Sequence, residues 1–187
     1  VVASIPGVVQ LVGSALDAGI YFIGSIFFTS AATIQWLTSR GLAFDVLDLD
    51  WWSSSVQLIG TLYFNATTFR AFQTGLDANE YDRLVWTPDA LGSVCFLVAS
   101  YFACVAVSGP TARPRRTRDS AIATLNLVGA IAFGIAAVAS YVVPSTGSAI
   151  DLAWANLFTA LGGVCFFAGS VLLLPKRTPP PGSRPHD

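Results

Sequence analysis

Charge is scarce in this chain. Of its 187 residues, 11% are charged and 53% are hydrophobic, whereas about 25% of the residues in an ordinary soluble domain are charged. So few polar side chains cannot cover a core of this size in water. The composition therefore excludes a soluble globular protein and predicts an integral membrane protein.

Histidine and cysteine are also rare. The single His is His186, next to the last residue, which excludes a haem with two His ligands, a His-ligated zinc or copper site, and a His base within the membrane. The three Cys residues have no Cys-x-x-Cys spacing, so we expect packing residues and neither a disulfide framework nor a thiolate metal site. They are Cys95, Cys104 and Cys165. No cofactor is predicted.

Motifs of catalysis are absent as well. The chain has no Walker loop, no Gly-x-Ser-x-Gly elbow, no His-Glu-x-x-His pair and no glycine-rich dinucleotide turn. Asp48-Leu49-Asp50 is similar to a metal-binding Asp-x-Asp sequence, but a solvated turn at the membrane surface is favoured there. We therefore predict that the protein is not an enzyme.

Long apolar runs are what the chain has in abundance. Five of them, of about 18 to 23 residues, are long enough to cross a hydrocarbon core of about 30 Å. They contain a single charged residue, Arg70, and lack the alternation of a transmembrane barrel strand. The expected spans are residues 19–37, 54–72, 90–107, 122–143 and 152–174. The sequence predicts an all-α, polytopic transmembrane helical bundle over residues 1–175 and a disordered tail over residues 176–187.

Tryptophan and proline support these boundaries. Every Trp lies near the end of an expected span, where its amphipathic ring can lie at headgroup depth. Pro88 and Pro144 lie in the gaps, where proline stops a helix. Asp17 and Asp151 precede the first and last spans, where capping or solvation is favoured over a functional site. We expect loops over residues 73–89 and 144–151.

Positive charge is concentrated in alternate gaps, and the external gap over residues 73–89 contains one Arg, Arg83. It is concentrated between the third and fourth spans and in the tail, and it is absent from residues 144–151. Positive residues favour the cytoplasmic side, so we expect a bacterial inner-membrane protein with a cytoplasmic C-terminus and residues 1–18 outside. Four Arg residues are predicted to contact anionic lipid headgroups, at about 1 kcal/mol each, which needs no nucleic-acid partner. They are Arg113, Arg115, Arg116 and Arg118.

Helical hairpins repeat along the chain. Gln-Leu-Ile-Gly at residues 57–60 corresponds to Asn-Leu-Val-Gly at residues 126–129, and Leu-Gly-Ser-Val-Cys-Phe at residues 91–96 corresponds to Leu-Gly-Gly-Val-Cys-Phe at residues 161–166. These matches predict two tandem copies of one hairpin. Phe-Ile-Gly-Ser-Ile at residues 22–26 also matches residues 167–171. The first span is therefore expected to be the second helix of a third hairpin.

The first helix of that third hairpin is not in this sequence. A chain that starts at Val1 with an uncharged external end and no Met has nothing to translocate it. We expect either a sixth span upstream or a cleaved signal sequence. The repeat favours the sixth span.

Small and polar residues mark the expected helix contacts. Glycine lets helix backbones approach closely in lipid, and an amide inside a span needs a hydrogen-bond partner. Because Gln57 and Asn126 are equivalent in the repeat, pairing with each other or with backbone is favoured over a binding site. The predicted packing and interaction residues are Gly24, Gly60, Gly92, Gly129, Gly162, Gly169, Gln57 and Asn126.

Two resemblances follow from these stretches. Leu-Val-Gly at residues 11–13, Asp17 and Phe-Ile-Gly-Ser-Ile-Phe-Phe-Thr-Ser-Ala at residues 22–31 resemble the small YrhK-type membrane module. The rest of the chain resembles uncharacterised multi-pass membrane proteins of high-GC bacteria, which similarly begin with a further span. The stretches that show this second resemblance are residues 51–52, 57–65, 84–89 and 92–98. The resemblance implies no activity.

The sequence leaves three functions open, in order of preference. The first is an accessory, stabilising or assembly subunit of an inner-membrane complex, in contact with lipids and with protein partners or further copies of itself. The second is a small transporter or channel that uses the interface between the repeats. A transporter is expected to have paired charges in mid-membrane, and the expected spans contain no such pair. An intramembrane enzyme is the least favoured.

Overall fold

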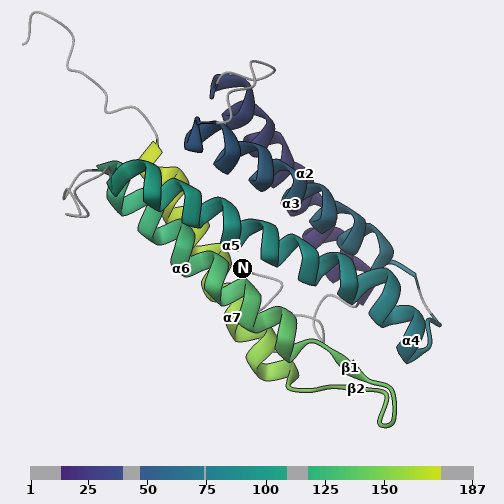
Figure 1. Cartoon of the computed structure of the whole chain (residues 1–187). Helices are drawn as coiled ribbons and strands as arrows, with labels where there is room; N and C mark the ends of the chain where they lie inside the picture. The colour runs from purple at the N-terminus through teal and green to yellow at the C-terminus, as the bar shows by residue number, and fades with distance from the viewer. Residues whose placement is uncertain (1–13, 40–46, 74, 109–117, 174–187) are drawn as a thin grey trace, which may run out of the picture.

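The computed structural model describes residues 14–39, 47–73, 75–108 and 118–173. Within these residues, long helices run up and down along one bundle, and a short β-hairpin lies at one end (Figure 1). The elements in chain order are α2 (Ser14–Thr38), α3 (Leu49–Arg70), α4 (Ala78–Tyr81), η1 (Asp82–Trp86), α5 (Thr87–Ser108), α6 (Arg118–Ala139), β1 (Val142–Val143), β2 (Ser148–Ala149) and α7 (Leu152–Leu173).

Four helical stretches in the described part of the chain are long and apolar enough to cross a membrane. They are Ala18–Thr38, Ala78–Ser108, Arg118–Ala139 and Leu152–Leu173. The prediction of an all-α, multi-pass membrane bundle is confirmed in this form. α3 is as long as α6, at 22 residues, but it contains more hydroxyl and amide side chains and lies outside this set.

The predicted loop over residues 73–89 is wrong for most of its length. α4, η1 and α5 form one continuous helical stretch, and Pro88 is the second residue of α5. Proline lacks a backbone N–H and disturbs the ordinary helical pattern. Here the π-helical turn η1 precedes it, and the Thr87 N–H donates to the Asp82 carbonyl, five residues back. The altered pairing of η1 accommodates Pro88 without ending the helix.

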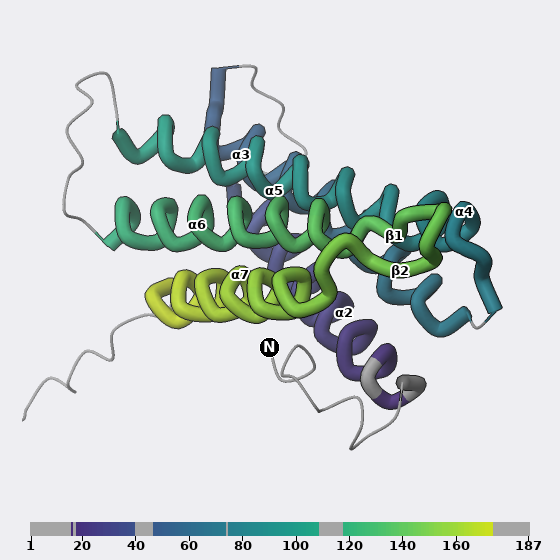
Figure 2. The backbone as a smooth tube through the Cα atoms, turned by 90° about the horizontal axis from the view of Figure 1, so that it is seen from below, coloured from purple at the N-terminus to yellow at the C-terminus, as the bar shows by residue number. Residues whose placement is uncertain are grey.

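The expected span over residues 122–143 is too long at its end. α6 stops at Ala139, and Val142 pairs with Ala149 in the antiparallel β1–β2 hairpin. Gly147 lies in the turn of this hairpin with φ +64°, a conformation that favours glycine. The predicted loop over residues 144–151 is therefore a hairpin that folds back beside α4 (Figure 2).

The other boundaries differ by a few residues. α3 starts at Leu49 and not at residue 54, because the Asp48 carboxylate caps it by accepting the N–H groups of Asp50 and Trp51. It ends at Arg70, which is exposed, two residues before the expected end. The expected upstream span, residue 174 of the last expected span and the tail over residues 176–187 lie outside the described residues.

The core is a cluster of aromatic rings, one from each long helix. Phe96 is fully buried, and its ring centroid lies 5.4 Å from that of Phe28 and 5.5 Å from that of Phe64. Phe133 and Phe166 stack with their centroids 5.5 Å apart and their planes inclined by 14°. Contacts of this kind add to the van der Waals energy of packing. This phenylalanine layer joins the helices of both hairpins to α2.

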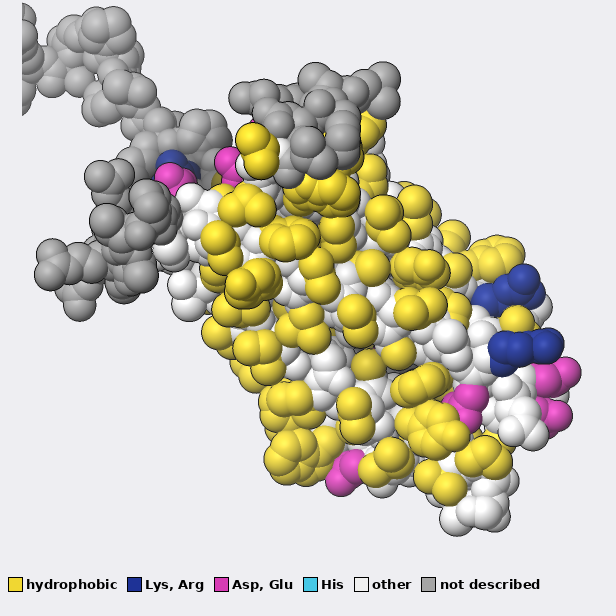
Figure 3. Space-filling view, viewed as in Figure 1, with side chains coloured by type: hydrophobic (Ala, Val, Ile, Leu, Met, Phe, Trp, Pro, Cys, Tyr) yellow, Lys and Arg dark blue, Asp and Glu magenta, His cyan; other side chains and the backbone are white. Residues whose placement is uncertain are grey.

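The outer surface has an apolar middle and charged ends. Figure 3 shows hydrophobic side chains over the middle of the visible face and charged side chains towards the ends of the bundle. Arg118 and Asp119 are exposed at one end, and Arg70 and Arg83 are exposed at the other. Large apolar residues lie in between, such as Phe27, of whose surface 72% is exposed. This distribution suits a lipid environment.

Candidate functional site

The first hairpin is held together by a close contact between glycines, which we call the first glycine seam. A Cβ atom added to Gly60 of α3 would lie 2.9 Å from the Phe96 ring and 3.0 Å from Cβ of Cys95. A Cβ atom added to Gly92 of α5 would lie 3.1 Å from the Gly60 carbonyl oxygen and 3.1 Å from the Phe64 ring. The two backbones thus approach each other more closely than any side chain would allow.

The second hairpin repeats this arrangement, which we call the second glycine seam. A Cβ atom added to Gly129 of α6 would lie 2.9 Å from the Phe166 ring and 3.1 Å from Cβ of Cys165. One added to Gly162 of α7 would lie 2.8 Å from the Phe133 ring and 3.0 Å from the Gly129 carbonyl oxygen. The two hairpins therefore use the same residue types in equivalent contacts.

Gly169 and Gly24, which match in the sequence, lie in different surroundings. A Cβ atom added to Gly169 of α7 would lie 2.8 Å from Oδ1 of Asn126 on α6. No described residue of another element lies within 4 Å of a Cβ atom added to Gly24 of α2, and Gly24 is exposed. A side chain of a neighbouring helix therefore covers the glycine of α7, which we call a filled contact. The matching glycine of α2 is not covered by any described residue, which we call an open contact.

α2 and α3 meet through hydroxyl and amide groups, which we call the polar seam. Gln57 donates from Nε2 to Oε1 of Gln35 at 3.3 Å, so in this structure it pairs with α2 and not with Asn126. The hydroxyls of Ser25 and Thr68 are 2.8 Å apart. Further contacts join Thr29 to the Thr61 carbonyl, Trp36 to Ser55, and Ser39 to Ser54. Four polar side chains of α3 are therefore used in contacts with α2 and with the residue that follows it.

The Arg residues predicted to contact lipid are described only in part. Arg118 is exposed in the first turn of α6 and donates from Nε to the Leu172 carbonyl in the last turn of α7. This hydrogen bond satisfies a carbonyl oxygen that the helix end leaves without a helical partner. Arg113, Arg115 and Arg116 lie outside the described residues.

A cavity of about 380 Å³ lies between the two hairpins and α2. Phe64 and Phe133 of the phenylalanine layer line it together with small residues such as Ala136 and Ala155. The hydroxyl, amide and carboxylate side chains that line it come from α2, from α3 and the residues after it, from the α4–α5 stretch, from the residue after α6, and from the start of α7. They are Tyr21, Thr67, Thr68, Gln73, Tyr81, Asp89, Ser93, Ser140, Asn156 and Thr159.

Asp89 is the charged residue of this cavity. The sequence placed it in an external loop, but it lies half-buried in the first turn of α5. Within the described part of the chain, no hydrogen bond or ion pair reaches its carboxylate. An ionisable side chain in a membrane-spanning helix that faces a cavity is a functional candidate.

The wall that contains Asp89 is fastened to the neighbouring elements. The Trp86 indole donates from Nε1 to the Ala137 carbonyl of α6 at 2.7 Å, and its ring centroid lies 5.0 Å from that of Tyr141. The carboxylate of Asp82 accepts the Val142 N–H of β1 at 3.2 Å. The π-helical turn is therefore held against both α6 and the β-hairpin.

The sequence contained a signal for this cavity. Tyr81, Val85, Asp89 and Ser93 are four residues apart and all line it, which is the spacing of one helix face. The signal could be used only if the helix were extended upstream through Pro88. The expectation of a loop at Pro88 concealed it.

Comparison of the chain with family models, with curated proteins and with solved structures gives no match. The resemblance to the YrhK-type module and to multi-pass proteins of high-GC bacteria therefore remains a prediction.

Proposed function

We propose that this protein is an inner-membrane protein that works by helix association, as an accessory or assembly subunit of a larger membrane complex. The proposal assigns it no catalytic residue. The observation that supports it is the open contact at Gly24 of α2. Its counterpart at Gly169 of α7 is filled by a side chain from the neighbouring helix α6.

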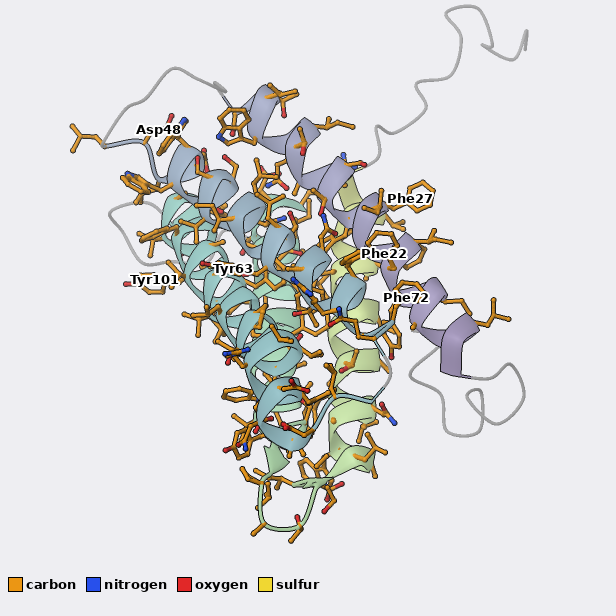
Figure 4. All side chains as sticks on the ribbon, turned by 90° about the vertical axis from the view of Figure 1, so that its right-hand side faces the viewer. Phe22, Phe27, Asp48, Tyr63, Phe72 and Tyr101 are labelled. Carbon is orange, nitrogen blue, oxygen red and sulfur yellow. The ribbon has the colours of Figure 1, made fainter. Side chains whose placement is uncertain are left out.

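The surface around Gly24 is a continuous helix face. Ile20, Ile23, Gly24 and Phe27 are spaced for one side of α2 and are all exposed, and we call them the Gly24 face. In Figure 4 the labelled Phe27 points away from the bundle. In the most apolar 18-residue stretch of α2, only 11% of the residues are buried within the protein, whereas the share in the corresponding stretch of α6 is 39%. α2 is attached on its other side, through the polar seam with α3 and through the rings of Phe22 and Phe28.

The occupant proposed for this face is a transmembrane helix of a partner. A glycine flanked by apolar side chains lets a second backbone approach closely, and in lipid this close packing drives association. α6 lies in this way against Gly169 of α7, with the Asn126 amide over the glycine. The partner helix would take the corresponding position on α2.

Photo-crosslinking in native membranes tests this proposal. A benzophenone side chain at position 27 should give a discrete protein adduct, whereas one at position 167, where Phe167 is 68% exposed on α7, should not. Gly24→Leu should abolish the adduct, and Ser170→Leu, at an exposed position of α7, should leave it. An adduct of twice the chain's mass would identify the partner as a second copy. The absence of any protein adduct at position 27 would refute the proposal.

The proposal includes five membrane spans, namely the four apolar helical stretches and α3, and it includes a cytoplasmic C-terminus. The up-and-down order of the helices brings the end of α5 and the start of α6 to the same end as the last turn of α7 (Figure 1). With the native Cys residues replaced, a cysteine at Thr117 or Ser183 should resist an impermeant thiol reagent in intact cells. A cysteine at Ala78 should react. Labelling at position 117 from outside would overturn this orientation.

A small transporter is the second candidate, because the cavity lies between the two hairpins and contains an unpartnered carboxylate. The two candidates differ in what Asp89→Asn should do. A subunit should keep its crosslinked partner and any activity of the complex. A transporter should lose substrate flux while the partner adduct at position 27 stays unchanged.

A further inference from the structure

The cavity has the size and lining of a binding site for a small molecule. Its volume of about 380 Å³ lies in the range of about 300 to 1,000 Å³ that is typical of ligand pockets. Aromatic rings make up much of its wall, namely those of Tyr21, Phe64, Tyr81, Trp86 and Phe133. The remaining question is which chemistry its polar groups would accept.

Several polar groups of the wall can act only as acceptors towards a ligand. Thr67, Thr68 and Ser140 each donate to a backbone carbonyl oxygen, at 3.1, 2.9 and 3.0 Å. A hydroxyl has a single proton, so one that is donated within the protein leaves only lone pairs for a ligand. The Trp86 N–H is likewise used, since it donates to the Ala137 carbonyl. These three hydroxyls therefore offer only lone pairs to a ligand, and they favour one that carries hydrogen-bond donors.

The charge of the wall favours a cation. Asp89 is its charged residue, and no Lys or Arg lines the cavity among the described residues. An anion would find no positive partner there, and a neutral molecule would leave the carboxylate without a counter-charge. Because an unpaired charge is unfavourable inside a bundle, a bound cation would relieve it. The aromatic rings would add cation–π attraction.

We propose that this cavity binds a primary alkylammonium group, with the Asp89 carboxylate as its counter-ion. The three N–H donors of such a group would meet the hydroxyl oxygens of the wall, and its alkyl part would contact the aromatic rings. A quaternary ammonium group has the same charge but no N–H donors, so it would leave these acceptors unused. This inference goes beyond the subunit function and does not depend on the partner at α2.

Binding to the purified full chain in detergent tests the ligand class with four matched probes. Butylammonium should bind saturably, as measured by calorimetry and by a rise in the melting temperature. Tetramethylammonium should bind more weakly, and butanol and butyrate should show no saturable binding. Absence of butylammonium binding, or equal binding of butanol, would overturn the proposal.

Variants of the wall test the site. Asp89→Asn removes the charge at nearly constant shape and should weaken butylammonium binding about tenfold or more. Asp119→Asn, a matched change at an exposed carboxylate of α6, should leave it unchanged. If Asp89→Asn does not fold, Ala155→Leu supplies a second test, because it fills part of the cavity and leaves the Asp89 side chain unchanged. A folded Ala155→Leu variant with full binding would refute the site.

Binding in nanodiscs of two lipid compositions shows whether the ammonium group belongs to a lipid or to a free amine. In nanodiscs that contain phosphatidylethanolamine, butylammonium binding should be weaker than in phosphatidylcholine nanodiscs if a lipid headgroup occupies the cavity. The lipid extracted with the wild-type chain should then be richer in phosphatidylethanolamine than that extracted with Asp89→Asn. Equal binding in both nanodiscs would identify a free amine as the ligand. Both outcomes support the alkylammonium site.

Discussion

The polar seam and the second glycine seam join pairs of helices by different means. α2 and α3 are joined by side-chain hydrogen bonds, such as that between Ser25 and Thr68, whereas α6 and α7 are joined by backbone approach at Gly129 and Gly162. At these glycine contacts an added Cβ atom would lie 2.8 to 3.1 Å from a ring, a Cβ atom or a carbonyl oxygen, so a neighbour would have to shift. A hydroxyl pair can lose one bond and keep most of its packing. The hairpins should therefore be rigid units, and the attachment of α2 should be more adaptable.

The sharpest test of this contrast adds one methyl group to a glycine seam. In Gly162→Ala the new Cβ would lie 2.8 Å from the Phe133 ring and 3.0 Å from the Gly129 carbonyl oxygen. Overpacking of this kind should lower the free energy of unfolding by about 1 to 3 kcal/mol. Gly134→Ala is the control, since its Cβ would meet Leu97 at an ordinary 3.5 Å. Unfolding of the purified chain by denaturing detergent measures both, and equal stability of the two variants would contradict the contrast.

A double-mutant cycle at the polar seam should show a smaller effect. Ser25→Ala and Thr68→Val each remove one member of the hydroxyl pair with little change in shape. Hydrogen bonds between membrane helices contribute about 0.6 kcal/mol on average, so the coupling between the two changes should be of that size. The same unfolding assay gives the four stabilities. A coupling as large as the effect of Gly162→Ala would mean that the polar seam is no more adaptable than the glycine seams.

The smallest effect is expected at the Gly24 face. Gly24→Ala adds a methyl group where there is no neighbour within 4 Å, so the stability of the purified chain should change by less than about 0.5 kcal/mol. Gly169→Ala, at the matching position of α7, should have an effect between those of Gly24→Ala and Gly162→Ala, because the added atom would lie 2.8 Å from Oδ1 of Asn126, the end of a side chain that can rotate away. If Gly24→Ala destabilises the isolated chain as strongly, then the Gly24 face is already occupied and cannot receive a partner.

The repeat in the sequence indicated which residues occupy equivalent places. Gly60 and Gly129 have the same neighbours in their hairpins, and so do Gly92 and Gly162. A local match of this kind is sufficient because each hairpin is formed by neighbouring segments of the chain. The predicted role of these residues towards partners is a separate matter and stays a prediction. The match between α2 and α7 gives the alignment but not the surroundings, since Gly24 and Gly169 differ in what covers them.

Local composition could not give the helix ends or the cavity. An apolar run predicts that its residues lie in the membrane, but it does not predict which secondary structure they form. Val142 and Val143 are apolar and form a strand. Pro88 is tolerated because of the π-helical turn before it, and such a turn depends on its contacts with α6 and with the β-hairpin. The cavity around Asp89 is formed by five separate segments, so no single stretch of sequence contains it.

The phenylalanine layer limits how the sequences of the two hairpins can diverge. Phe64 and Phe133 come from their first helices, Phe96 and Phe166 from their second, and every ring touches a ring of the other hairpin. If the hairpins arose by duplication, neither copy could change its residues in the phenylalanine layer independently. A smaller side chain in one hairpin would leave a void beside the rings of the other. Compensating changes should therefore appear in pairs across the layer, while the lipid-facing residues of each copy diverge independently.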